Sequence, residues 1–314
     1  MKKNKILVLG SIAFDHIMEF PGFFKEHIVA DKLDTLNISF LADSFTRMRG
    51  GTAPNIAYSM ALLDLNPAIV GTCGKDFAEY KNWLENNHVD TSYIKVLEDD
   101  YTASCFITTD KAHNQITVFY PGAMSRDPEI SLKELDLEGV QMAVIAPTEP
   151  QAMAKWASEC AELGIPYLYD PGMQIPRLPE DVLISGIKGA KIVIFNEYEY
   201  AMLSEKTKLT YDDILKSVDL FVVTLGENGS VLRTKTETAV VAAAKAYNVV
   251  DPTGCGDAYR AGLLKGYFEG ASIETAGKYA SISAVYAVEH KGATEHKYTM
   301  EEFYERYRLN YGGN

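Results

Sequence analysis

The 314-residue chain contains 47% apolar and 23% charged residues, values typical of a soluble globular protein, and its length suits one large α/β domain. Its formal net charge of −13 argues against a nucleic-acid surface, which needs a basic stripe, and no apolar run approaches the ~20 residues of a membrane span. Four widely separated cysteines (Cys73, Cys105, Cys160, Cys255) fit a reduced, cytoplasmic protein better than a disulfide or zinc framework.

The first third of the chain mixes buried strands and helices with two stretches that lack helical periodicity. Strands are expected at 5–10 and 68–71, and helices at 52–65 and 76–88. The two non-helical stretches, 11–49 and 93–121, contain alternating pieces at 13–20 and 36–42 and a hairpin pattern at 102–109 and 115–120. We predict that these stretches leave the main fold and form a small β-rich lid.

From residue 127 onward, strands and helices alternate regularly. Strands are expected at 141–145, 167–169, 191–195, 220–224, 230–234, 239–243 and 247–250, and helices at 130–136, 151–163, 197–204, 255–269, 272–289 and 299–308. This alternation predicts a mostly parallel, doubly wound sheet flanked by helices, in one domain over residues 1–314.

Two features near the amino end are candidates for binding hydroxyl groups. Asp15 follows the first strand, at the carboxyl end where open α/β sheets bind ligands, although a lone loop Asp is usually just solvated. Gly50 and Gly51 precede a helix that contains Asn55, so a substrate could approach the backbone and bond the amide. An ordinary helix start with Pro54 in its first turn explains the same residues.

Two turns in the second half sit at the ends of expected strands. Asn196 and Glu199 have the spacing of a capping box, which needs no further function. Thr224, Gly226 and Gly229 lie in a tight turn that would also serve as a simple hairpin. The six histidines show no metal-ligand spacing, and only His290 is a candidate for the neighbourhood of a nucleotide.

Residues 249–264, V-V-D-P-T-G-C-G-D-A-Y-R-A-G-L-L, are the most informative stretch. A short β-branched run, a Pro-Gly turn and a small-residue helix would leave several backbone N–H groups free at a helix start, which suits an anion. Gly254, Cys255 and Gly256 are the candidate anion-binding residues. Asp257, in the first helical turn, would either complement the helix dipole or accept a proton from a hydroxyl group.

The motifs and their order along the chain resemble those of the ribokinase-like (PfkB) carbohydrate and nucleoside kinases. They are an Asp after the first strand, G-G-x-x-x-N, N-x-x-E, T-x-G-x-x-G and D-x-x-G-x-G-D. The resemblance implies that Asp257 acts as the base beside the anion hole. It implies that Asp15, Gly50, Gly51 and Asn55 hold a sugar. Asn196, Glu199, Thr224, Gly226 and Gly229 would then lie near ATP, with Glu199 acting on Mg²⁺ indirectly. Asp251 would help to hold K⁺, as in many relatives.

Within that family, the segments 50–55, 114–124 and 170–172 look like the bacterial and archaeal adenosine or nucleoside kinase group. Lid aromatics such as Phe119 could stack on a base, although alternating aromatics usually face a core. The expected reaction is ATP-dependent phosphorylation of a purine nucleoside such as adenosine, with a possible homodimer through the lid. A sugar kinase of the same family is the near alternative, and a non-catalytic binding protein of the same fold is the distant one.

Overall fold

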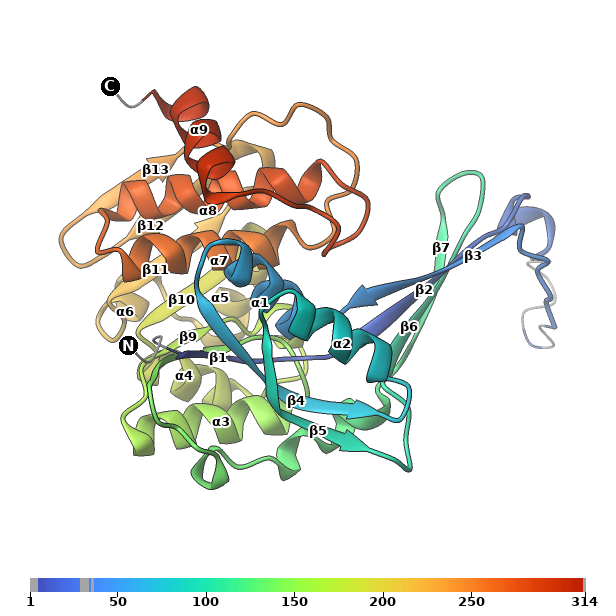
Figure 1. Cartoon of the computed structure of the whole chain (residues 1–314), viewed down its shortest axis with the longest axis horizontal. Helices are drawn as coiled ribbons and strands as arrows, with labels where there is room; N and C mark the ends of the chain where they lie inside the picture. Colours follow the sequence, from blue (N-terminus) through green and yellow to red (C-terminus); the bar gives the residue numbers. More distant parts are fainter. Residues whose placement is uncertain (1–4, 29–33, 35–36, 313–314) are drawn as a thin grey trace.

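The computed structural model describes residues 5–28, 34 and 37–312, which form two β-sheets and the helices that cover one of them (Figure 1). The central sheet has the strand order β13-β12-β11-β10-β9-β8-β1-β4-β5, and the small sheet has the order β3-β2-β6-β7. The central strands are β1 (Lys5–Leu9), β4 (Asn66–Gly74), β5 (Asp90–Leu97), β8 (Val140–Ile145), β9 (Tyr167–Tyr169), β10 (Ile192–Asn196), β11 (Leu220–Thr224), β12 (Ser230–Arg233) and β13 (Thr238–Val241). In the central sheet, the neighbouring strands β5, β4, β1, β8, β9, β10 and β11 pair in parallel. The last two strands, β12 and β13, pair in antiparallel fashion. The predicted mostly parallel α/β fold is therefore confirmed.

Helices cover both faces of the central sheet, because its buried strands are apolar on both sides. In β1, Ile6 and Val8 join one buried cluster, whereas Leu7 and Leu9 join the other. The first cluster packs against α1 (Thr52–Leu62), α2 (Ala78–Asn86), α7 (Cys255–Phe268), α8 (Ile273–Val288) and α9 (Met300–Tyr311). The second packs against α3 (Pro150–Leu163), α4 (Glu180–Gly189), α5 (Glu197–Thr207) and α6 (Tyr211–Leu215). No helix in the described part of the chain is both long and apolar enough to cross a membrane.

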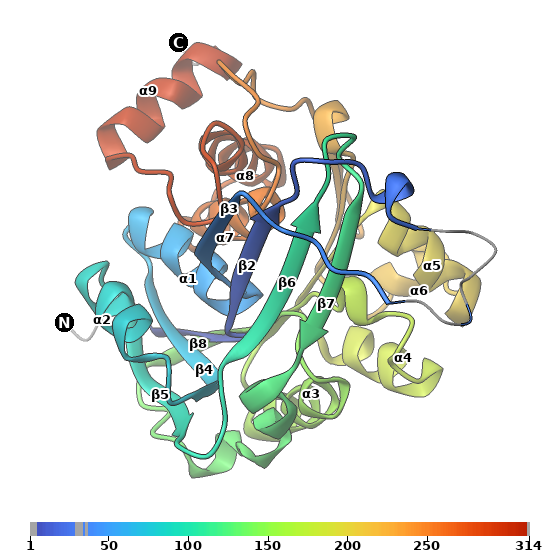
Figure 2. The same cartoon turned by 90° about the vertical axis from the view of Figure 1, so that its right-hand side faces the viewer.

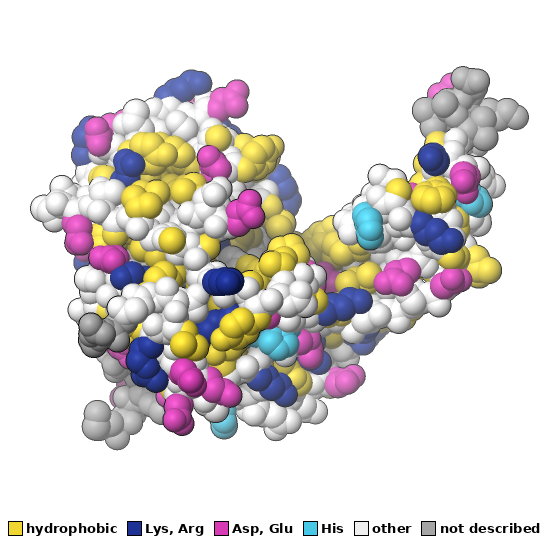
Figure 3. All heavy atoms as spheres, turned by 90° about the horizontal axis from the view of Figure 1, so that it is seen from above, with side chains coloured by type: hydrophobic (Ala, Val, Ile, Leu, Met, Phe, Trp, Pro, Cys, Tyr) yellow, Lys and Arg dark blue, Asp and Glu magenta, His cyan; other side chains and the backbone are white. Residues whose placement is uncertain are grey.

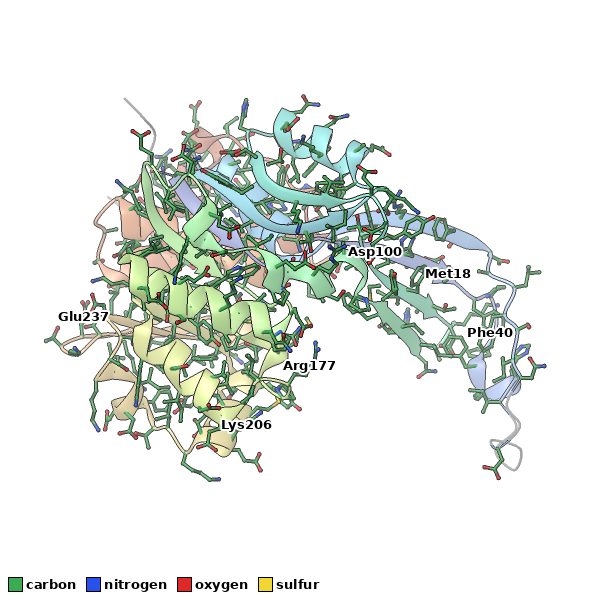
Figure 4. All side chains as sticks on the ribbon, turned by 90° about the horizontal axis from the view of Figure 1, so that it is seen from below. Met18, Phe40, Asp100, Arg177, Lys206 and Glu237 are labelled. Atoms are coloured by element: carbon green, nitrogen blue, oxygen red, sulfur yellow. The ribbon has the colours of Figure 1, made fainter. Side chains whose placement is uncertain are left out.

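The small sheet projects from the main body as an arm (Figures 1 and 2). Its strands are β2 (Ala13–Glu19), β3 (Ser44–Gly50), β6 (Ala103–Thr109) and β7 (Gln115–Tyr120). Met18 and Phe40 lie along the arm and Asp100 lies near its base (Figure 4). Stacked aromatic rings give the outer part of the arm a small core of its own, since Phe20 and Phe24 are buried there beside Phe40.

Two boundaries predicted for the arm are wrong. Residues 93–97 belong to β5 in the central sheet, where they pair with β4. As the edge strand, β5 exposes residues such as Lys95 and so lacks the continuous apolar run of a buried parallel strand. The alternating piece at 36–42 forms no strand over its described residues 37–42, where Leu41 is exposed, and residues 35 and 36 lie outside the described chain. Instead, β3 pairs with β2, on the side of β2 opposite β6.

Other predicted elements also differ. Residues 247–250 form no strand, because the N–H groups of Val250 and Asp251 donate to the carbonyl of Val288 (2.9 and 3.1 Å) and leave the β-branched side chains in solvent. The helix expected at 130–136 is only a 3-10 turn, η4 (Leu132–Glu134), because the chain becomes extended at Leu135 (φ −92°, ψ 152°). Helices α4 and α6 were not predicted.

Candidate active site

The candidate site lies along the carboxyl ends of the parallel strands, beside the amino end of α7. Asn196 ends β10 and is in register with Thr224, which ends β11, while Asp170 directly follows β9. Open α/β sheets bind ligands at this edge. Figure 3 shows a hollow between the main body and the arm, so both can contact the same small ligand.

Free backbone amides at the start of α7 form the candidate anion hole. Gly254 caps the helix with φ +79°, a left-handed conformation that a residue with a side chain rarely adopts. The N–H groups of Gly254, Gly256 and Asp257 have no acceptor among the described residues. Cys255 differs from the expectation, because its N–H donates to the Pro252 carbonyl (3.2 Å) and is not available to an anion. Burial raises the pKa of its thiol to about 12, so the side chain stays protonated at neutral pH.

Asp257 and Asn55, 202 residues apart, meet beside this anion hole. Asn55 Nδ2 donates to Asp257 Oδ2 at 2.9 Å. Burial raises the pKa of Asp257 to about 6, against the opposing effects of the Arg260 charge and the Asn55 hydrogen bond. Asn55 Oδ1 is buried without a hydrogen-bond partner, so one acceptor beside the carboxylate is free for a ligand hydroxyl.

A close backbone approach requires a glycine at Gly51, whereas Gly50 lies against the Asp15 side chain. A Cβ at Gly50 would lie 2.6 Å from Asp15 Oδ2, and one at Gly51 would lie 2.4 Å from the Ser11 carbonyl oxygen. Gly51 also has φ +91°. Because β2 and β3 are paired here, the glycines, Asp15 and the start of α1 lie together. Burial, and then the charge of Asp251, raise the pKa of Asp15 above its usual range.

One face of the arm continues from Asp15 toward Phe119. Strand pairing aligns Met48, Asp15, Cys105 and Phe119 in a row across all four strands. Residues in register point to the same face of a sheet. Phe119 is 48% exposed on the edge strand β7, so an aromatic ring is available at the end of the row.

The residues expected near ATP lie on the other side of the anion hole. Asn196 and Glu199 form a complete capping box, with Glu199 N donating to Asn196 Oδ1 (2.8 Å) and Asn196 N donating to Glu199 Oε2 (2.7 Å). Thr224 precedes the turn at Gly226, and a Cβ at Gly229 would lie 2.0 Å from the Val241 carbonyl oxygen. His290 follows α8, and its Nδ1 is bonded to the Tyr286 carbonyl (2.8 Å).

Asp251 joins the turn before the anion hole to the loop after α8. Its Oδ1 accepts from Thr253 N and its Oδ2 from Gly292 N, both at 2.9 Å. Burial raises the pKa of Asp251, but these hydrogen bonds and the Lys291 charge outweigh burial, so the net shift is downward. Asp251 therefore stays ionised.

Sequence reasoning missed Asp170 and Arg260, which form a buried ion pair behind Asp257. The sequence contains a signal for each of these two residues. Asp170 follows a predicted strand at its carboxyl end, and Arg260 is a cation inside a helix of small and apolar residues.

Comparisons with known proteins identify the family of this chain. The family model described as pfkB family carbohydrate kinase matches residues 3–299. A nucleoside kinase of Methanocaldococcus jannaschii is 31% identical over 307 residues, or 97% of each chain, and its structure superposes with a TM-score of 0.89 over 98% of this chain and 99% of that one. The nucleoside kinase of Burkholderia thailandensis, solved with inosine, has 35% identity and a TM-score of 0.87 over 98% of this chain and 99% of that one. The chain therefore belongs to the pfkB family of carbohydrate kinases, which are phosphotransferases that act on an alcohol group.

Proposed function

We propose that this protein transfers the γ-phosphoryl group of ATP to the 5′-hydroxyl of a purine nucleoside such as adenosine. The observation that carries the proposal is the hydrogen bond between Asn55 and Asp257 beside the free amides, with Asp15 lying against Gly50 just before the helix that carries Asn55. The inosine bound to the B. thailandensis relative supports a purine nucleoside. A base beside free amides also favours a kinase over a non-catalytic binding protein, which has no need of the base.

In the proposed reaction, the sugar lies over Gly50 and Gly51, with its hydroxyls held by Asp15 and Asn55. Asp257 orients the acceptor hydroxyl and takes its proton as the oxygen attacks the γ-phosphorus. The bond between that phosphorus and the β,γ-bridging oxygen breaks, and ADP leaves. The amides of Gly254, Gly256 and Asp257 stabilise the charge on the transferring oxygens. The arm acts as a lid that excludes water.

ATP and Mg²⁺ would occupy the Asn196–Thr224 side of the site. One Glu199 oxygen is held in the capping box, and Oε1 has no protein partner in the described part of the chain. No group of three or more His, Cys, Asp or Glu side chains there forms a metal cage. This fits Mg²⁺, which is commonly held by one or two carboxylates together with substrate phosphates and water. When bound, the ion would neutralise phosphate charge.

The substrate preference follows from the arm. A ribose held by Asp15 leaves its base along the Cys105–Phe119 row, whereas a free sugar would leave that row in water. Stacking on an aromatic ring contributes about 1–3 kcal/mol per base. We therefore expect adenosine or inosine to exceed ribose and fructose in kcat/KM by at least about tenfold, equivalent to about 1.4 kcal/mol.

An ATP-dependent phosphorylation panel with ribose, fructose, fructose 6-phosphate, adenosine, inosine, guanosine and cytidine tests this preference. If a free sugar leads and every nucleoside is inert, the sugar-kinase alternative replaces the nucleoside proposal. Phe119→Ala should reduce the ratio of kcat/KM for nucleosides to kcat/KM for free sugars, since it removes the exposed ring.

We also propose that K⁺ binds beside Asp251 and the carbonyls around Thr253 and Gly292. The ionised carboxylate and hard oxygen donors suit this ion, and the position lies directly behind the anion hole. Replacing K⁺ by tetramethylammonium at constant ionic strength should lower kcat severalfold. Equal rates in the two salts would rule the site out.

A second copy of this chain is proposed to cover the outer face of the arm. Phe45 and Val118 are 62% and 61% exposed there, and His16 stacks on both Phe45 and Phe106. Exposed apolar patches of this kind mark interaction sites, and no described strand pairs with either edge of the small sheet. Light scattering should give twice the mass of one chain. Val118→Lys should yield monomers, while Val240→Lys, at an exposed valine of β13, should not; a monomeric wild type would contradict the proposal.

A further inference from the structure

Arg260 is a buried cation within the first turns of α7. It lies three residues after Asp257, is 8% exposed, and has Ala258 and Ala261 as neighbours in a helix of small buried residues. Arginine is almost never this buried unless it is paired. The ion pair between Arg260 Nε and Asp170 Oδ2 supplies a partner, but the guanidinium makes a further contact in the site.

That contact is a hydrogen bond from Arg260 Nη1 to the carbonyl oxygen of Gly256 (2.7 Å). The Gly256 carbonyl and the Asp257 N–H belong to one planar peptide unit and point in opposite directions. Holding the carbonyl on the guanidinium side therefore aims the Asp257 N–H away from Arg260, as one of the three free amides of the anion hole. With Nε in an ion pair with Asp170, the guanidinium fork links this peptide to the residue that follows β9.

The guanidinium is also the positive charge that acts on Asp257. Among the described residues, the other charged or titratable groups that interact with Asp257 are the buried Asp170, the thiol of Cys255 and the phenol of Tyr80, and Glu199 interacts with Arg260. Burial raises the pKa of Asp257, and the Arg260 charge is the largest influence in the opposite direction. Asp170 Oδ1 has no hydrogen-bond partner among the described residues, and Asp170 Oδ2 forms the ion pair with Arg260.

We propose that Arg260 is a positioning residue of the transfer site, which fixes the last amide of the anion hole and holds positive charge beside Asp257 so that the base stays ionised. This inference rests on the proposed function. It adds a residue behind the site that touches neither the sugar nor the phosphates.

The test is the pH dependence of kcat/KM for the best acceptor in the panel, measured for wild type and for Arg260→Gln. The acid limb of the wild-type profile is expected near pH 6. Because a nearby opposite charge shifts a carboxyl pKa by about one unit or more, Arg260→Gln should move the limb up by about one pH unit. At pH values below the acid limb, a shift of that size lowers kcat/KM by about a further tenfold.

Two other variants separate positioning from stability. Arg306→Gln removes a second buried arginine, which lies in α9 and pairs with Glu289 at the end of α8, and should lower the melting temperature while leaving the acid limb unmoved. Arg260→Lys keeps the charge but cannot make both contacts of the fork. It should keep the limb within about half a unit and lower kcat by about five- to tenfold.

A folded Arg260→Gln variant with the wild-type limb would overturn the inference. If that variant does not fold, Arg260→Lys decides, since wild-type kcat would exclude a positioning role and a reduced kcat with an unmoved limb would support it. Carboxyl-carbon NMR of Asp257, assigned by comparison with Asp257→Asn, titrates the base directly. This titration therefore tests the effect of the Arg260 charge on Asp257 without any measurement of activity. A panel in which no nucleoside or sugar is phosphorylated would refute the proposed function, but not this effect.

Discussion

Asp257→Asn is expected to lower kcat by about 10²–10⁴-fold, the usual loss when a positioned base is removed. The amide has the shape of the carboxylate and leaves Asn55 in place, but it cannot take the hydroxyl proton. ATP binding should be nearly unchanged, because the three free amides and the Asn196–Thr224 edge remain. Steady-state kinetics and ATP titration calorimetry measure the two effects separately.

The folded state of the same variant provides the control. The pKa of Asp257 is raised by burial to about 6, so the folded protein holds this proton more tightly than the unfolded chain does. Wild type therefore loses stability as pH rises between about 4 and 6, and Asp257→Asn does not. The variant should be at least as stable as wild type at pH 7.5. If a folded Asp257→Asn protein keeps wild-type turnover, the carboxylate does not act as a base and only complements the helix dipole.

The parts of the site that were predictable are those in which chemistry and chain position coincide. Asn196 and Thr224 each end an apolar strand, and parallel strands bring their carboxyl ends to one edge, so their proximity follows from the pattern. Gly254 and Asp257 sit at a turn that opens into a small-residue helix, and the Pro-Gly turn and the small residues predicted this local structure.

What could not be predicted depends on distant parts of the chain. The 2.9 Å contact of Asn55 with Asp257 needs α1 and α7 to pack side by side, and no local pattern specifies this. The loss of the Cys255 amide depends on the turn at Pro252. The run at 247–250 has strand propensity but no strand to pair with, so its N–H groups bond to the end of α8 instead. The sequence marks Asp170 and Arg260 as unusual residues, but only the fold brings them together as an ion pair.

Gly254→Ala is expected to lower kcat by about 10²–10³-fold, the loss seen when one donor of a charge-stabilising pocket is removed. A methyl group there would lie 2.5 Å from Ala293 Cβ and 2.7 Å from Ala293 Cα, and the alanine would have to hold φ +79°, so the turn must move and the amides lose their common direction. Gly270→Ala is the matched control, because Gly270 follows the other end of α7 with φ +68° and has nothing within 4 Å of an added Cβ. It carries the same kind of backbone strain away from the site and should lower only the melting temperature. If Gly254→Ala and Gly270→Ala reduce stability alike and both keep wild-type kcat, the amides around Gly254 do not stabilise the transferring phosphoryl group.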